Sequence, residues 1–252
     1  MGSGELLAVG PALGAAIAAA VVAAAGVCAA AGLGHGAAVL RAGGRAVLQL
    51  GAVSLIIAAV LSSGPLTLGF IAVMLAVASL TAGRRITPGW SGAWALLPIC
   101  VPVLPVVGVL VAAGLAPRTG AALIPLSGIL IGGALTATVL AGRRVTEELG
   151  ARRGEVEAAL SLGLLPREAA IEIGRPAAAA ALLPALDQTR TVGLVTLPGA
   201  FVGMLLGGAT PFEAGAVQLF VLAALLLVES AAIVIVLELV VRGAFPSASG
   251  PR

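Results

Sequence analysis

The feature that most constrains this chain is a series of apolar runs, each about as long as a bilayer is thick. Seven runs can be followed, at residues 6–31, 45–65, 66–82, 94–114, 121–142, 191–208 and 214–241. A helix needs roughly 20 apolar residues to cross the hydrocarbon core of a membrane. Because only 10% of the residues are charged, a water-facing surface cannot be covered. The sequence therefore predicts an all-α, polytopic membrane protein with about seven transmembrane helices, and it excludes a soluble domain.

The runs leave little sequence for any second domain, so residues 1–252 are expected to form one membrane-embedded unit in the cell membrane. A single long polar stretch interrupts them, at about residues 143–190. The sequence has 14 Lys and Arg residues, all of them Arg, and a formal net charge of +3. They occur singly or in pairs between apolar runs, without interleaved aromatic residues, so the lipid bilayer and not nucleic acid is the expected partner.

The arginines also predict how the helices are oriented. With the N-terminus outside and the C-terminus cytoplasmic, Arg118 is isolated on the outer side. The cytoplasmic side then carries Arg41, Arg45, Arg84, Arg85, Arg143, Arg144, Arg152, Arg153, Arg167, Arg175, Arg190 and Arg242. An excess of Lys and Arg marks cytoplasmic loops. The pattern thus favours an odd number of spans and a cytoplasmic loop at 143–190.

Within that loop, the sequence predicts two short helices joined by a turn. Gly163 can end the first helix in a left-handed conformation, and Pro166 suits the first turn of the second. Such a compact, partly apolar element fits a groove of a soluble partner. The alternative is an amphipathic helix lying on the bilayer, which the glutamates at 155, 157, 168 and 172 disfavour because they would face anionic lipid.

The same loop resembles a known signature. Glu157, Ala158 and Ala159, followed by Gly163, resemble the EAA loop through which permeases of ATP-binding-cassette transporters bind their ATPase. A wider set of segments resembles the FetB-type family of iron-export permeases, to which plant aluminium-tolerance half-transporters belong. These segments are 44–50, 124–128, 157–163, 183–187, 191–199 and 207–211.

The resemblance implies a half-sized permease that pairs with a separate ATP-binding subunit, with two copies of each. Residues Glu157, Ala158, Ala159, Gly163, Pro166 and Arg167 would then form the ATPase-coupling loop. The chain contains no Lys and hence no phosphate-binding loop of the Gly-Lys-Ser/Thr type. ATP and Mg²⁺ are therefore expected in the partner, and neither an enzymatic activity nor a cofactor is expected in this chain. The family's two methionines after Leu-Pro-Gly are replaced here by Ala200 and Phe201, which weighs against transferring iron as the substrate.

Polar residues inside apolar runs are candidates for a translocation pathway, because an ionisable group costs roughly 2.5–3.5 kcal/mol at the centre of a membrane helix. The candidates are Gln49, Met204, Gln218 and Glu229. Glu229 can either bind a cation or proton in a cavity or stay protonated between helices. Glu238 is expected to reach toward Arg242, four residues away. The single His and the two Cys are too scattered to predict a metal site.

Asp187 and Arg190 are spaced for an i, i+3 ion pair at the start of the sixth run, where they could couple loop motion to the membrane helices. The leading hypothesis is an ABC permease subunit exporting a metal ion such as iron. Two rivals stay open: a stand-alone, ion-coupled secondary carrier that uses Glu229, and a non-transporting membrane scaffold whose loop binds another protein.

Overall fold

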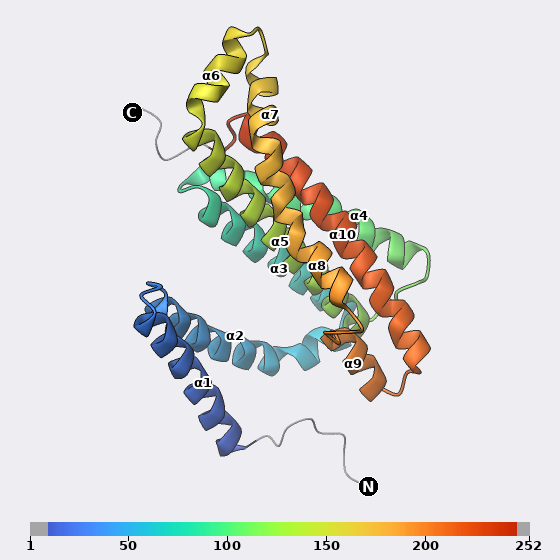
Figure 1. Ribbon diagram of the computed structural model, residues 1–252. Coiled ribbons are helices and arrows are strands. Elements are labelled where there is room, and N and C mark those ends of the chain that lie inside the picture. The colour runs from blue at the N-terminus through green and yellow to red at the C-terminus, as the bar shows by residue number, and fades with distance from the viewer. Residues whose placement is uncertain (1–9, 246–252) are drawn as a thin grey trace. The chain divides into compact units, whose positions relative to one another are not determined.

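The computed structural model describes residues 10–245, which separate into two compact units, one ending at Val60 and the other beginning at Leu61. The first unit is a helical hairpin of α1 (Pro11–Ala30) and most of α2 (Gly36–Ser62) (Figure 1). Gly43 brings the two helices together, because a Cβ placed there would lie 2.7 Å from Cγ1 of Val21. Most other side chains of this hairpin are exposed, as is typical of helices that face lipid or another protein.

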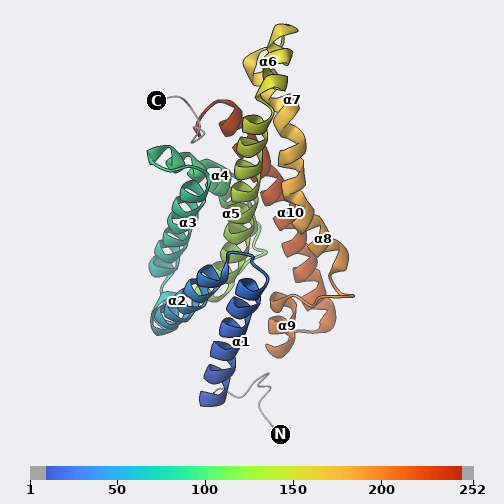
Figure 2. The same cartoon turned by 60° about the vertical axis from the view of Figure 1, so that its left-hand side comes forward.

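The second unit is a helical bundle arranged around one long helix, α5 (Gly120–Ala151). This helix packs against α3, α4, α7 and α10, and Figures 1 and 2 show it between them. The remaining elements are α3 (Gly64–Ile86), η1 (Trp90–Ala95), α4 (Leu96–Ala112), α6 (Arg153–Ser161), α7 (Pro166–Ala179), η2 (Ala180–Leu182), α8 (Leu183–Thr191), α9 (Gly199–Leu206) and α10 (Pro211–Val241).

Glycines let α5 approach its neighbours closely, as is common where helices pack in lipid. A Cβ at Gly142 would lie 2.7 Å from Cδ1 of Ile86, and one at Gly120 would lie 2.6 Å from Oγ1 of Thr67. Between these points Leu130, Ala134 and other small or branched side chains of α5 are fully buried. The bundle thus owes its close packing to the Gly- and Ala-rich composition of its central helix.

Seven helices of residues 10–245 are long and apolar enough to cross a membrane, which confirms the predicted fold class. They are Pro11–Ala30, Gly36–Ser62, Gly64–Ile86, Trp90–Ala112, Gly120–Ala151, Pro166–Thr191 and Pro211–Val241. The protein is therefore a multi-pass membrane protein.

The sixth span differs from the predicted one at 191–208. The structure places it at Pro166–Thr191 as the continuous series α7, η2 and α8. The predicted span is instead broken: Gly193 has a φ of +83°, Pro198 precedes the short helix α9, and Gly208 has a φ of +92°. The polar loop expected over 143–190 is accordingly shorter, because its second half is a membrane-length helix whose alanines are apolar enough for a span.

This correction keeps the number of spans odd, but it places Asp187 and Arg190 at a different end of the bundle from the one predicted. In the second unit, α6 and the C-terminal turn of α10 lie at one end, whereas α8 ends near α9 at the opposite end (Figure 1). Arg190 and Asp187 therefore lie at the end opposite to α6, not in the same loop as Glu157. We call the end formed by residues 143–167 and 238–242 the charged end.

Candidate translocation site and coupling end

The charged end carries the helical hairpin that the sequence predicted. Gly163 has a φ of +93°, and its N–H donates to the Leu160 carbonyl at 3.0 Å, while the Leu164 N–H donates to the Ala159 carbonyl at 3.2 Å. This pair of bonds is the Schellman motif that ends α6. Pro166 is the first residue of α7. The predicted glycine stop and proline start are both confirmed.

An arginine at the α5–α6 junction fixes the hairpin to the end of α5. The Arg152 guanidinium contacts Glu148 of α5 at 3.2 Å and donates two hydrogen bonds to Glu155 of α6. The hydrogen bonds from Arg152 hold the pKa of the Glu155 carboxyl below its usual range. Because both carboxylates share one guanidinium, Arg152 joins α6 to the last turn of α5.

A second set of charges fixes α7 to α10. Arg167 donates two hydrogen bonds of 2.8 Å to the carboxylate of Glu238, and Arg242 donates a third, of 2.6 Å, to the same carboxylate. The predicted contact between Glu238 and Arg242 is confirmed. The contact with Arg167 was not predicted, because it joins residues 71 positions apart. Glu238 lies inside the apolar run 214–241, and its need for a charged partner there was the signal that could have predicted such a contact.

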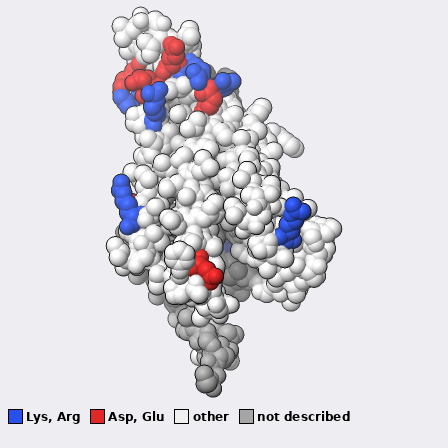
Figure 3. All heavy atoms as spheres, turned by 90° about the vertical axis from the view of Figure 1, so that its right-hand side faces the viewer, with Lys and Arg blue, Asp and Glu red and all other residues white. Residues whose placement is uncertain are grey.

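The tip of the hairpin is apolar although it projects from the charged end. Leu162 is 83% exposed and Leu165 is 64% exposed, and the predicted coupling residues Glu157, Ala158, Gly163 and Arg167 are also exposed. Figure 3 shows charged side chains gathered around this hairpin, with isolated ones elsewhere on the same face. Exposed apolar side chains rimmed by charges are typical of a protein-binding surface.

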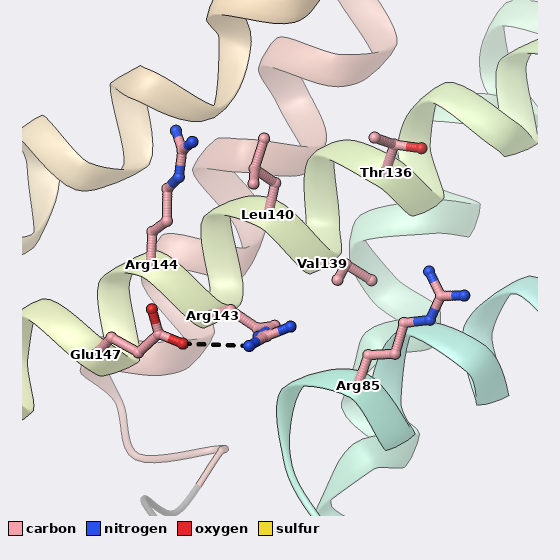
Figure 4. A pocket seen from close by; sticks show the side chains of 7 residues that line it. All are labelled: Arg85, Thr136, Val139, Leu140, Arg143, Arg144 and Glu147. Atoms are coloured by element: carbon pink, nitrogen blue, oxygen red, sulfur yellow. Dashed lines mark hydrogen bonds and ion pairs between the residues drawn. The ribbon is translucent and has the colours of Figure 1, made fainter. Parts of the chain in front are cut away.

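Below the hairpin, an arginine-rich cavity of about 300 Å³ lies between α3 and α5. Arg85 of α3 and Arg143 of α5 extend into it, and Arg143 is joined to Glu147 (Figure 4). Arg144, which also lines the cavity, donates a hydrogen bond of 2.9 Å to the carbonyl of Ala180 and so connects α5 to η2. The cavity lies where the apolar part of α5 ends, and its charge is predominantly positive.

A second cavity, of about 290 Å³, lies between α5, α8 and α10 and contains Glu229. The Glu229 side chain lies directly over Gly133 of α5, because a Cβ added there would lie 2.7 Å from the carboxylate Oε1. Thr136 and Gln188 also line the cavity. The predicted candidate Glu229 therefore faces a cavity near the middle of a membrane-length helix, and most of the other lining residues are small or apolar.

The other predicted candidates are placed separately. Gln218 lies on the buried side of α10, and its Oε1 has no hydrogen-bond partner among residues 10–245. Met204 of α9 lines a third cavity, of about 670 Å³, which is mostly apolar. Gln49 belongs to the other compact unit and is exposed on α2.

The predicted ion pair of Asp187 and Arg190 is present, with 3.4 Å between Nη1 and Oδ1, but both side chains are well exposed. No group of three or more His, Cys, Asp or Glu side chains that could hold a metal is found among residues 10–245.

One face of α5 connects the three cavities. Ile129 lines both the apolar cavity and the Glu229 cavity, and Thr136 lines both the Glu229 cavity and the arginine cavity. Thr136, Gly133 and Gln188 were not among the residues predicted from the sequence. Gly132, Thr136 and Arg143 are spaced so that they lie on one face of a helix. That spacing was the signal that could have identified this face of α5.

Comparison with known proteins places the chain in a family. Residues 12–245 match the model of the uncharacterised protein family UPF0014. The UPF0014 membrane protein STAR2 of Oryza sativa is 35% identical over 194 residues, covering 75% of this chain and 68% of that protein. A UPF0014 membrane protein of Synechocystis is 32% identical over 217 residues, covering 82% of this chain and 83% of its own length.

A relative with a functional name is the probable iron export permease protein FetB of Escherichia coli, which is 33% identical over 119 residues. That match covers 47% of this chain and 46% of FetB. No solved structure matches the chain. The family match spans almost all of the described residues, and so the chain belongs to the UPF0014 family of membrane proteins.

Proposed function

We propose that this protein is the membrane permease subunit of an ATP-driven exporter of a metal cation such as iron. A separate ATP-binding subunit would dock on the charged end, which would face the cytoplasm. The name of the relative FetB supports iron export as the starting hypothesis. The assembled transporter would contain two copies of this chain and two copies of the ATPase.

One observation carries this proposal: the α6–α7 hairpin ends in exposed leucines and is bonded at its base to the two longest helices of its unit. Leu162 and Leu165 offer an apolar contact to a soluble partner. Arg152 connects α6 to α5, and Arg167 connects α7 to α10. A partner that moves the hairpin would therefore move helices that line the Glu229 cavity.

This connection suggests how ATP would drive transport. Binding of ATP would draw the two ATPase subunits together and carry the hairpins with them. The motion would reach α5 and α10 as a rigid-body shift, which would open the cavities toward one side of the membrane at a time. The chain itself would hydrolyse no ATP, and ATP and Mg²⁺ would be held by the partner.

A pull-down of the tagged protein from its native membranes in mild detergent tests the proposal. The wild type should retain a phosphate-loop ATPase in stoichiometric amount. Gly163→Asp should lose it, because an Asp at a φ of +93° is strained and disrupts the hairpin. Gly154→Asp is the matched control: it adds the same charge to α6, and a Cβ there has open space and an ordinary φ.

If the wild type and Gly154→Asp retain the ATPase and Gly163→Asp loses it, docking at this hairpin is supported. An abundant, intact protein without any ATPase would overturn the proposal.

The half-buried Glu229 in its cavity also favours a second candidate, a stand-alone carrier coupled to protons or ions. In that case transport would stop when the proton gradient is dissipated and would continue when ATP is depleted. The reverse pattern is expected for the ATP-driven permease. A membrane scaffold would show no solute flux that depends on either Glu229 or the hairpin.

A further inference from the structure

The Glu229 carboxylate occupies an unusual place for a charged group. It lies near the middle of α10, within a 31-residue apolar span, and the residue is half-buried. Among the described residues no hydrogen bond or ion pair joins it to another side chain. A charged carboxylate open to hydrocarbon is strongly disfavoured, so this side chain either stays protonated or shares its cavity with water, an ion or covering protein.

The cavity is lined mainly by small and apolar residues, and its few polar side chains all offer oxygen ligands. The polar side chains that line the cavity with it are those of Gln188 and Thr136. The Thr136 hydroxyl donates to the Gly132 carbonyl at 3.0 Å, so its oxygen lone pairs stay available to the cavity. Carboxylate, amide and hydroxyl oxygens are the ligands preferred by hard divalent cations, and no Cys, Met or His side chain lines this cavity.

The size and charge of the cavity also fit a cation. Its volume of about 290 Å³ is far larger than the roughly 30 Å³ that one water occupies in the liquid, so an ion can keep part of its water shell. With a single carboxylate, the cavity offers one negative charge to a divalent ion. Binding is then weak enough for release, as a transport site requires.

We propose that this cavity binds one partly hydrated divalent cation, with the Glu229 carboxylate as its charged ligand and Gln188 and Thr136 as neutral oxygen ligands. The inference rests on the proposed function and gives its cargo a site. It also gives Gly133 a role, since a Cβ added there would crowd both Leu225 and the carboxylate and shift the Glu229 side chain.

Binding of Mn²⁺ to the full-length protein in lipid nanodiscs tests the site, with free Mn²⁺ followed by electron paramagnetic resonance. The wild type should bind one Mn²⁺ per chain, and Glu229→Gln should raise the Kd by about tenfold or more, because the charged ligand is lost. Glu229→Asp should keep part of the affinity. Gln188→Leu should weaken binding to a smaller extent.

Two matched controls separate the site from general effects. Gly133→Ala should weaken binding, because the new methyl group displaces the carboxylate, whereas Gly215→Ala, where a Cβ has open space on the same helix as Glu229, should bind as the wild type does. Glu172→Gln removes an exposed carboxylate of α7 and should leave the Kd unchanged. Thermal unfolding of each variant identifies any that fails to fold.

Equal Mn²⁺ binding by the wild type and Glu229→Gln, or no saturable binding by the wild type, would overturn this inference. The pull-down tests the proposed function separately. If the ATPase co-purifies but Mn²⁺ does not bind, the permease proposal stands and the cation site falls. If Mn²⁺ binds but no ATPase co-purifies, the site stands and the carrier becomes the better description.

Discussion

At the scale of single residues, the charged end contains one carboxylate that accepts from two arginines and one arginine that contacts two carboxylates. Glu238 accepts from Arg167 and Arg242, and Arg152 contacts Glu148 and Glu155. Ion pairs this exposed contribute little to folding stability, because water screens them and long side chains lose entropy. Their planar, bidentate geometry instead fixes direction. Coupling between helices is thus the property that these contacts should control.

Arg167→Gln tests this expectation. It removes both hydrogen bonds to Glu238, and we expect transport per ATP hydrolysed to fall about fivefold or more, within the usual range of coupling between sites. The thermal unfolding midpoint should stay close to that of the wild type. Arg167→Lys keeps the charge without the bidentate contact and should be intermediate.

The measurement is ATP-dependent transport and ATPase activity of the reconstituted complex. Arg175→Gln, at an exposed position of the same helix, is the control and should behave as the wild type. A large loss of thermal stability in Arg167→Gln, with coupling preserved, would show that this contact is structural.

At the scale of elements, the joint between α3 and η1 depends on two glycines in backbone contact. A Cβ at Gly83 would lie 2.1 Å from the carbonyl oxygen of Gly92. We expect Gly83→Ala to destabilise the protein by about 1–3 kcal/mol, the usual cost of forcing extra atoms into a packed site. Trp90 and Trp94 belong to η1, so their fluorescence during thermal unfolding reports directly on this joint.

Gly69→Ala is the matched control in the same helix, because a Cβ there meets no atom within 4 Å. Alanine is a better helix former than glycine by about 1 kcal/mol, so this variant should unfold at the same temperature as the wild type or above it. Equal effects of both substitutions would show that Gly83 and Gly92 are not packed against each other.

The elements also show what the sequence could predict. Hydropathy located six of the seven spans, because long apolar runs leave few alternatives in a membrane. It failed at the sixth, because Arg175 and Asp187 made the stretch from Pro166 to Thr191 look like a loop, whereas Gly193 and Pro198 lie inside an apolar run that cannot stay helical. Local signals at Gly163 and Pro166 were correct because they depend only on neighbouring residues.

The candidate site was predictable only in part, for a related physical reason. Glu229 was identified from its cost in a membrane, a property of one residue and its run. Its neighbours Thr136 and Gln188, and the contact between Arg167 and Glu238, join segments far apart in the chain. Such contacts depend on which helix faces meet, and helix packing in lipid is decided by small residues whose pattern recurs throughout this sequence.

At the scale of the whole molecule, the position of the sixth span decides whether the α6–α7 turn and the segment after α8 lie on opposite sides of the membrane. If α7 and α8 cross, Leu162 and Leu194 lie on opposite sides, and the proposed docking of an ATPase requires Leu162 to be the cytoplasmic one. With Cys28 and Cys100 replaced by Ala, we expect a cysteine at Leu162 to react with a membrane-impermeant maleimide in inverted vesicles only. A cysteine at Leu194, which is 92% exposed, should react in intact cells only.

Each other outcome has a definite consequence. Labelling of both cysteines from the same side would mean that residues 166–191 do not cross, and the span predicted at 191–208 would be restored. Labelling with the sides exchanged would place the α6–α7 hairpin outside the cell, where no cytoplasmic ATPase can reach it, and the permease proposal would fail. Because both positions are exposed, a cysteine there should leave the packing intact, and this measurement tests the direction of the chain independently of transport.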